Sequence, residues 1–499
     1  MTLTIRAVPR LSTTRASLVV LAAVVAVVGW QGVTTIGRDF SLDARAHLAY
    51  TQYFGHHLAP PPASDNYEFS NPPLFAIVAL AAEGAVRVLP SYPLELGQSG
   101  LARALWLALV AAGAFALTRA GRRLRLAGTT ALGLATVWGL DEALSLGKTQ
   151  SWVSGQLVSL GAAVGLVVVT VMIAEELWPG RRWRALGVGA VVALYPIVLR
   201  LGILFHPETT FALLAGATVL LVLRAARTGW SVRLGVAAGL TCGLAAWTRA
   251  SALAVAVSLF TVAALAGGRR ARGFVVAAVV ALAVVAGPWW IVAYHLWGNP
   301  LESNLSRPGY MLAHGEPASF YVSAPLRSLI LHPYRPDFQN EFWPKLHAEL
   351  WSDWFGGLHH LWADPSRLGK VTASTQSALG FVFDLLALGG LAVRGVPAAL
   401  RVARKRTASA DSDIRWAMLS TLAVASFAVY AFTVVRFPQA EGDPIKTSYL
   451  LFTAPCWAAF TVAAWASLRR RSRKAHRFLA VVALLYLGSY GAMLGGAFT

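Results

Sequence analysis

The stretch SLVVLAAVVAVVGWQGV, residues 17–33, is an apolar run without a charged side chain. A helix of about 20 such residues crosses the hydrocarbon core of a bilayer. Similar runs recur from here to the C-terminus, and only 13% of the 499 residues are charged, against roughly 25% in soluble domains. We therefore predict an all-α polytopic membrane protein, with residues 17–33 retained as a signal-anchor.

The chain is strongly basic, with a formal net charge of +20. In a soluble protein this charge favours nucleic-acid binding, but here the basic residues cluster between apolar runs. The clusters are residues 119–125, 180–184, 224–233, 268–272, 401–406 and 469–477. Cytoplasmic loops of membrane proteins carry such clusters. We therefore interpret them as signals of orientation that contact anionic membrane lipids, and we predict no nucleic-acid partner.

The order of apolar segments and basic clusters predicts the topology. Fourteen apolar segments start near residues 17, 74, 101, 126, 154, 185, 208, 233, 250, 273, 376, 414, 448 and 478. With the N-terminus inside and every segment spanning, all six clusters fall outside, against the positive-inside rule. The second segment, residues 74–89, is short and contains Glu83 and Arg87, so we predict that it lies in the interface. About thirteen transmembrane helices then remain, with the C-terminus outside.

This topology collects several polar motifs on the outer face. In SLDARAHLAYTQYF, residues 41–54, Asp43, His47 and Thr51 stand four apart, as on one face of an interfacial helix. A simpler interpretation is that Asp43 caps this helix. In YEFSNPPLF, residues 67–75, the paired Pro72 and Pro73 force an extended turn because the residue before each proline avoids the α region.

These motifs carry a resemblance to a known class. The order of these motifs resembles the first outer loop of GT-C membrane glycosyltransferases. That order is an Asp-x3-His helix, an acid, Pro-Pro-Leu, a short apolar segment and an arginine at the head of the next span. The nearest forms are protein O-mannosyltransferases and lipid A aminoarabinose transferases. Asp43 matches the catalytic aspartate, Ala44 replaces the usual glutamate, and Arg103 matches the arginine. Residues 244–255, 287–301 and 445–455 resemble later parts of the class more loosely.

The resemblance implies an inverting transfer of a sugar from a polyprenyl-phosphate donor to an acceptor hydroxyl, with Asp43 as general base. The acceptor is a glycan, a lipid or a protein. Cations must then stabilise the leaving phosphate, and arginine suits this contact. Snorkelling to the interface is the alternative for each cation. The candidate substrate-binding residues are His47, Pro72, Pro73, Arg200, Arg249 and Lys446.

A divalent cation is a further candidate cofactor. His206 and Glu208 lie in FHPETT at a span boundary, and together with Glu68 they offer the imidazole and carboxylate ligands that suit Zn²⁺ or Mn²⁺. A helix start with Pro207 at its first position explains the same motif without a metal.

We predict three regions: a GT-C-like transmembrane module over residues 1–294 that includes an outer loop at 35–100, an outer-face loop region at 295–375, and C-terminal transmembrane helices at 376–499. Tryptophan and tyrosine in the middle region stack on sugars or belong to the interface belt. The predicted protein is a multi-pass glycosyltransferase of the plasma membrane with an extracytoplasmic active site. A transporter or flippase, an envelope-glycan polymerase or ligase, and a non-catalytic scaffold are the alternatives.

Overall fold

The computed structural model describes residues 13–35, 43–88, 149–302, 316–331, 333, 341–352, 367–405, 410–438 and 445–497. Every regular element in these ranges is a helix. In chain order the elements are α1 (Thr13–Thr35), α2 (Ala44–His57), α3 (Leu74–Val88), α6 (Gln150–Leu177), α7 (Arg182–Ala193), α8 (Pro196–Ile203), α9 (Glu208–Thr228), α10 (Val232–Ala246), α11 (Ala252–Trp297), α12 (Ala318–Val322), α13 (Leu326–Leu331), α14 (Phe342–Trp351), α15 (Arg367–Gly390), η3 (Leu391–Gly395), α16 (Val396–Lys405), α17 (Asp411–Arg436), η6 (Thr447–Thr453), α18 (Ala454–Arg471) and α19 (Arg473–Ala497).

The prediction of an all-α polytopic membrane protein is confirmed. Among the described residues, seven helices are long and apolar enough to cross a bilayer, and the pair α7 and α8, bent by 61°, adds an eighth if it is one span. The seven are Gln150–Leu177, Glu208–Thr228, Ala252–Trp297, Gly369–Arg404, Asp411–Arg436, Thr447–Arg471 and Arg473–Leu494. The segments that start near 101 and 126, the cluster at 119–125 and Arg103 lie outside the described residues, so the count of thirteen stays a prediction.

The helix α11 contains two of the predicted segments, joined by a sharp break. Gly268 has φ 52° and ψ −133°, a conformation that glycine adopts at low cost. Gly267, next to the break, faces Trp230 at the start of α10, whereas Trp247 beyond the other end of α10 donates to the Val285 carbonyl 2.5 Å away. The chain therefore reverses at Gly268, and the second half of α11 runs parallel to α10.

Small residues set the close approach of α10 and α11. A Cβ added at Gly235 or Gly239 would overlap the backbone carbonyl of Phe274 or Ala278, respectively. The spacing of four residues puts both glycines on one face of α10. Stripes of small residues allow helix backbones to approach in a membrane, where van der Waals packing and not burial from water drives association.

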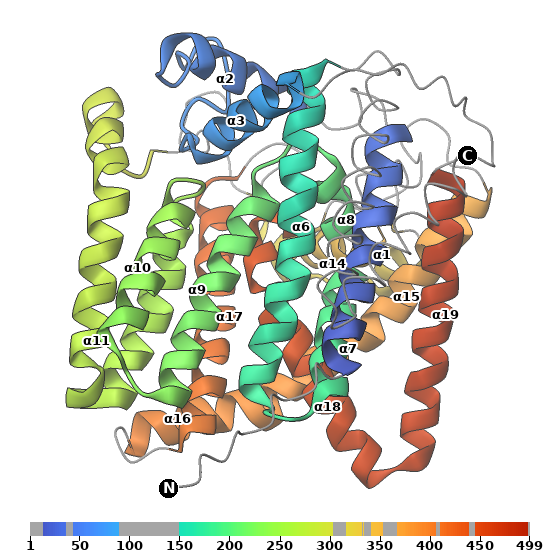
Figure 1. Cartoon of the computed structure of the whole chain (residues 1–499). Coiled ribbons are helices and arrows are strands. Elements are labelled where there is room, and N and C mark those ends of the chain that lie inside the picture. The colour runs from blue at the N-terminus through green and yellow to red at the C-terminus, as the bar shows by residue number, and fades with distance from the viewer. Residues whose placement is uncertain are drawn as a thin grey trace, which may run out of the picture.

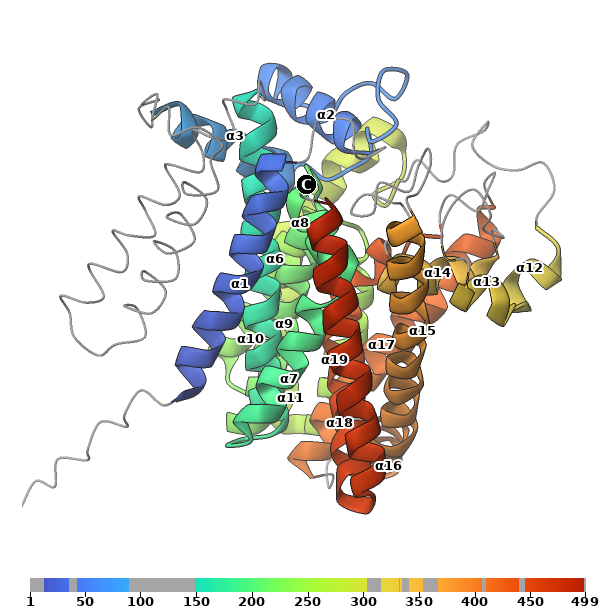
Figure 2. The same ribbon diagram turned by 90° about the vertical axis from the view of Figure 1, so that its right-hand side faces the viewer.

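The polar motifs and the basic turns lie at opposite ends of the helix bundle. The turns after α6 and α9, the break in α11, the helix α16 and the turn between α18 and α19 lie at the end where α1 begins (Figure 1). The blue helices α2 and α3 lie across the other end, where α6 begins and α19 finishes (Figures 1 and 2). At 15 residues, α3 is shorter than a normal span, as its sequence predicts.

A small second core fixes α2 and α3 to the bundle. Buried Ala44, Phe75, Trp152 and Phe205 belong to one cluster, and the rings of Phe75 and Phe205 meet edge to face with centroids 5.3 Å apart. Gly155 on α6 leaves room for the Phe205 ring, which a Cβ there would overlap. This cluster brings the start of α2 beside the turn between α8 and α9, where two of the predicted site residues lie.

The described part of segment 295–375 is not only a surface loop. It contains α12, α13 and α14, which Figure 2 shows beside α15 on the flank of the bundle. Trp351 of α14 is buried in the main core, stacked on Phe383 at 5.4 Å and edge to face with Tyr195 at 4.9 Å. The interface-belt and sugar-stacking interpretations therefore both fail for Trp351, which is a core residue.

Candidate functional site

Asp43 stands immediately before α2, and its side chain turns away from that helix. Among the described contacts it makes no capping hydrogen bond. Instead Oδ2 accepts a hydrogen bond from the Lys446 ammonium at 3.1 Å, and Oδ1 accepts one from the Tyr67 hydroxyl at 3.1 Å. The capping interpretation is therefore not supported, and Asp43 joins three distant parts of the chain.

The surroundings of Asp43 favour its ionised form. Burial alone raises the pKa of this carboxyl group, but the Lys446 ammonium and then His206 outweigh that cost and hold the pKa well below its ordinary value. The side chain is still 21% exposed. Asp43 is therefore a carboxylate that is charged at neutral pH and open on one side.

His47, His206 and Glu208 converge beside Asp43. His47 belongs to the buried face of α2, and its ring meets that of His206 edge to face with centroids 4.8 Å apart. The Nε2 of His206 lies 3.9 Å from Oδ2 of Asp43, and its Nδ1 contacts Oε2 of Glu208. Each of the three residues offers one potential ligand atom, and these atoms lie within 4.8 Å of one another.

The turn that presents His206 follows from its local sequence. Ser159 of α6 holds the turn at the His206 backbone, because its hydroxyl donates to the carbonyl at 3.0 Å and accepts from the amide at 3.2 Å. Pro207 caps α9, and Glu208 is the first residue of that helix. A helix does start in FHPETT, but Pro207 is its N-cap and not its first residue, and the same turn also directs His206 and Glu208 to one point.

The three residues fit a divalent cation. The Nε2 of His47, the Nδ1 of His206 and the Oε2 of Glu208 are buried, and no hydrogen bond of acceptable geometry to them is found within the described ranges. His206 Nδ1 and Glu208 Oε2 contact each other, so a cation bound by all three residues would replace that direct contact and also give His47 Nε2 a partner. Two imidazoles and one carboxylate are also the protein ligands of catalytic zinc in several hydrolases.

A proton on His206 would, like a bound cation, supply positive charge beside the Glu208 and Asp43 carboxylates. Burial lowers its pKa, but Glu208 and then Asp43 raise the pKa to about 9, whereas burial and the neighbouring His206 hold the pKa of His47 well below normal. One imidazole of the pair is thus cationic and the other neutral when no metal is bound. Metal ligands must be neutral imidazoles, so a cation would replace the proton on His206.

Glu68 lies beside this group. Its Oε1 is 4.0 Å from Nε2 of His47, and its other oxygen accepts a hydrogen bond from Asn71. Burial raises the pKa of Glu68 to about 6, even though Arg249 lowers it. In the described structure His47 occupies the third ligand position that the sequence suggested for Glu68.

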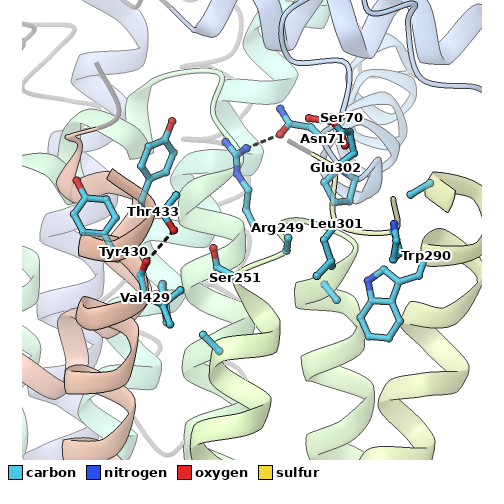
Figure 3. Close-up of a pocket in the computed structure, with 18 of the residues that line it drawn as sticks. Ser70, Asn71, Arg249, Ser251, Trp290, Leu301, Glu302, Val429, Tyr430 and Thr433 are labelled. Atoms are coloured by element: carbon cyan, nitrogen blue, oxygen red, sulfur yellow. Dashed lines mark hydrogen bonds between the residues drawn. The ribbon is translucent and has the colours of Figure 1, made fainter. Parts of the chain in front are cut away.

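Arg249 connects the Pro-Pro turn to the cation group. It lies between α10 and α11, and it donates from Nη1 to Oδ1 of Asn71 and from Nη2 to Oε1 of Glu208. Figure 3 shows its guanidinium directed to Asn71. Its Nε has no hydrogen-bond partner among the described residues. The side chain lines a cavity of about 210 Å³ together with Pro72, Trp289, Trp297, Tyr430 and Tyr449.

A second, larger and mainly apolar cavity lies on the other side of η6. Its volume is about 480 Å³, and its lining includes Trp343, Phe381, Leu388, Phe427 and Trp457 from α14, α15, α17 and α18. Leu450 of η6 borders both cavities. One short helix therefore borders both the cavity that Arg249 lines and this more apolar one.

The predicted site residues divide into two sets. Seven of them form one continuous network of contacts: Asp43, His47, Glu68, His206, Glu208, Arg249 and Lys446. Arg200 instead pairs with Glu349 on α14 at 2.8 Å. Pro73 lies just before α3, where its carbonyl accepts from the Ile77 amide at 2.9 Å.

Two residues of the network were not predicted from the sequence. Asn71 bonds both Glu68 and Arg249, and its carbonyl accepts from Tyr50 at 2.7 Å. Tyr67 donates to Asp43. Both stand inside YEFSNPPLF, so their nearness to the paired prolines was the available signal.

Comparisons with known proteins identify structural similarities only. No protein-family model and no curated protein matches the chain. The oligosaccharyltransferase of Archaeoglobus fulgidus, in a crystal structure of its complex with Zn and sulfate, is similar at 14% identity and a TM-score of 0.42. The match covers 96% of this chain and 53% of that one, so the chain spans about half the length of that protein.

ArnT from Cupriavidus metallidurans is also similar, both bound to undecaprenyl phosphate and in the apo state. The identities are 15% and 16%, the TM-scores are 0.38 and 0.37, and each match covers 91% of this chain and 78% of the other. Both kinds of protein are GT-C membrane glycosyltransferases, the class that the first outer loop resembles. Similarity at this level concerns the path of the chain and assigns no activity.

Proposed function

We propose that this protein transfers a sugar from a polyprenyl-phosphate donor to an acceptor hydroxyl, with inversion, on the extracytoplasmic side of the plasma membrane. The observation that carries the proposal is the contact between the partly exposed Asp43 carboxylate and the Lys446 ammonium. A base and a cation are thereby held together, and the contacts from Asp43 through His206 and Glu208 connect them to Arg249, which lines the smaller cavity. The positive-inside rule supports the outer side, because this end of the bundle is opposite to the basic turns.

Asp43 acts as the general base in this proposal. The acceptor oxygen attacks the anomeric carbon from the face opposite to the phosphate, its proton passes to Asp43, and the bond between carbon and phosphate oxygen breaks. The electron pair of that bond leaves with the polyprenyl phosphate. A positioned base contributes typically about 10²- to 10⁴-fold to such a rate.

Lys446 and Arg249 receive the negative charge of the leaving phosphate. Arg249 is held from two sides by Asn71 and Glu208, which argues against simple snorkelling to the interface. Charged donors fixed in advance stabilise developing charge without reorganisation. A cation held by His47, His206 and Glu208 would supply further positive charge at this place.

The apolar cavity suits the hydrocarbon part of the donor. It is lined mainly by apolar side chains, and Leu450 also borders the cavity that Arg249 lines. An amphiphilic donor with its phosphate near Lys446 would place its chain on the apolar side of η6. This arrangement favours a lipid-linked donor over a soluble nucleotide sugar.

Transfer of labelled sugar by the purified chain tests the proposal. The wild type, Asp43→Asn and the control Asp65→Asn are compared with a panel of polyprenyl-phosphate sugars. Asp65 lies in the same loop, but its side chain is exposed and bonds Ser64 at 2.7 Å. We expect turnover by the wild type and D65N and a loss of about 10²-fold or more in D43N. Full turnover by D43N would exclude Asp43 as the base, and no turnover of any donor by the wild type would exclude the proposed function.

A further inference from the structure

Residues 445–447, which carry Lys446 into the site, are fixed by several contacts from the bundle. Ile445 is fully buried in a cluster with Phe342, Leu346 and Tyr430. The Lys446 amide donates to the Tyr430 hydroxyl at 2.9 Å, and the Thr447 hydroxyl donates to the Leu346 carbonyl at 2.8 Å. The position of the Lys446 side chain therefore depends on α14 and α17.

One of the contacts that fix residues 445–447 comes from the carboxylate of Glu349. It is buried on α14, with 1% of its surface exposed. One carboxylate oxygen accepts from Arg200 of α8 at 2.8 Å, and the other accepts from the Thr447 backbone amide. A buried carboxylate needs a positive partner and full hydrogen bonding, and Arg200 supplies the charge. Both oxygens are thus used, one for charge balance and one to hold η6.

The contacts continue from Glu349 to Asp43. Thr447 directly follows Lys446, whose ammonium donates to Asp43 Oδ2 at 3.1 Å. A hydrogen bond to an ionised group is shorter and stronger than a neutral one, so the Glu349 contact restrains the start of η6 better than a neutral acceptor would. A displacement of this start would move the ammonium relative to Asp43.

We infer that Glu349 is a positioning residue, which together with Arg200 holds the backbone at Thr447 so that Lys446 meets Asp43 and the donor phosphate. This inference rests on the proposed function, because it concerns the same base and cation. It also gives Arg200 a role other than direct contact with phosphate. Arg200 acts through Glu349, and Glu349 acts through Lys446.

A double-mutant cycle separates this role from simple packing. Glu349→Gln keeps the side-chain shape, but an NH2 donor replaces one of the two oxygens that accept from Arg200 and Thr447. The double variant R200M/E349L removes the buried charges together, which is often tolerated where a single removal is not. Each is measured alone and combined with Lys446→Met. The control Glu176→Gln changes a buried carboxylate that pairs with Arg227 at 2.6 Å.

We expect E349Q and R200M/E349L to lower kcat by about 10- to 100-fold in the Lys446 background, as small misplacements at active sites do. In the K446M background the same changes alter kcat by no more than about twofold, because their target is gone. E176Q leaves kcat unchanged. An equal loss in both backgrounds, or wild-type kcat in both variants, would overturn the inference.

Amide hydrogen exchange tests the inference without any turnover. The peptide that contains Thr447 exchanges faster in E349Q and in R200M/E349L than in the wild type, and E176Q leaves it unchanged. Unchanged exchange in both Glu349 variants would overturn the role of this residue. Faster exchange in a protein that transfers no sugar would leave the restraint intact and reject the proposed function alone.

Discussion

The Asp43 carboxylate and the Lys446 ammonium are 403 residues apart in the chain and 3.1 Å apart in space. Asp43 directly precedes α2, and Lys446 directly precedes the 3₁₀ helix η6 that leads into α18. Their contact joins the two ends of the chain at one point of the bundle. In this pair the Lys446 ammonium favours the ionised form of Asp43, and the first prediction follows from that.

Replacing Lys446 by methionine should move the acidic limb of the kcat/KM profile to higher pH. Burial raises the pKa of Asp43 and the Lys446 ammonium lowers it, so loss of the ammonium leaves burial less opposed. Asp43 must be ionised to act as a base, and in K446M it ionises only at a higher pH than in the wild type. A pH–rate profile measures this limb. K446R, which keeps the charge, serves as the control, and an identical limb in K446M and wild type would contradict the assignment of the base.

Arg249→Lys should weaken donor use more than its conserved charge suggests. The guanidinium bonds Asn71 and Glu208 with two different nitrogens, which a single ammonium cannot reproduce in the same geometry. We expect kcat/KM for the donor to fall by about 10-fold or more. Arg401→Lys is the matched control. Arg401 also donates from two nitrogens to one carboxylate, that of Asp413, but this pair is exposed and lies at the basic end of the bundle. Equal effects of R249K and R401K would refute the prediction.

The purified protein should bind a divalent cation through His47, His206 and Glu208. Metal content after dialysis against Zn²⁺ or Mn²⁺, measured by mass spectrometry, gives a readout independent of activity. H206A and H47A each remove one of three ligand atoms that lie within 4.8 Å of one another, so both should lower the bound metal strongly. Exposed His56→Ala is the control. Metal content that is equal in the wild type and H206A would show that the triad holds no cation.

Filling the apolar cavity should discriminate between donors by chain length. Ala387 on α15 lines this cavity, and tryptophan in its place occupies space that a hydrocarbon chain would use. A387W should raise the KM for a long polyprenyl donor by several-fold and leave a short-chain analogue nearly unaffected. Val393→Trp is the control, because Val393 lies in the following element η3 and is 59% exposed. A rise in KM that is the same for both chain lengths would argue against a chain in this cavity.

Gly239→Ala should destabilise the bundle without touching the site. The new methyl group would overlap the Ala278 carbonyl across the α10 and α11 contact, and overpacking of this kind typically costs about 1–3 kcal/mol. Thermal unfolding in detergent is the measurement. Gly161→Ala is the control, because a Cβ there meets nothing within 4 Å among the described atoms. A melting temperature of G239A that equals that of G161A would contradict the close packing.

Hydrophobic patterning was sufficient for much of the fold. The long helices from α6 onward, the shortness of α3 and the separation of the two halves of α11 follow from the lengths of apolar runs. The predicted spans near residues 17 and 233 are shorter apolar helices in the described structure, and the interfacial position of α3 stays a prediction. The position of α14 does not follow from such patterns. Its helix is short and contains Lys345, His347 and Glu349, so its sequence suggests solvent exposure, yet all three are buried. Their partners, such as Asp384 for His347 at 2.6 Å, come from distant segments.

For the site as well, local patterns could be read from the sequence, but contacts between distant segments could not. His47 and Asp43 share a local helical spacing, and His206 and Glu208 share a turn, so the sequence identifies each pair. The choice between Lys446 and Arg200 as the cation beside Asp43 depends on contacts between residues hundreds of positions apart. Nothing in their local sequence distinguishes a lysine that reaches Asp43 from an arginine that is neutralised by Glu349.

Leu450 lines both cavities, so under the proposed function one residue would contact both the sugar end and the lipid chain of the donor. Because one 3₁₀ turn forms a wall of both hollows, a bulkier sugar that displaced this wall would also narrow the channel for the chain. Evolution of a new sugar preference at this wall would then require a matched change in tolerated isoprenoid length, so the two specificities would drift together in related enzymes.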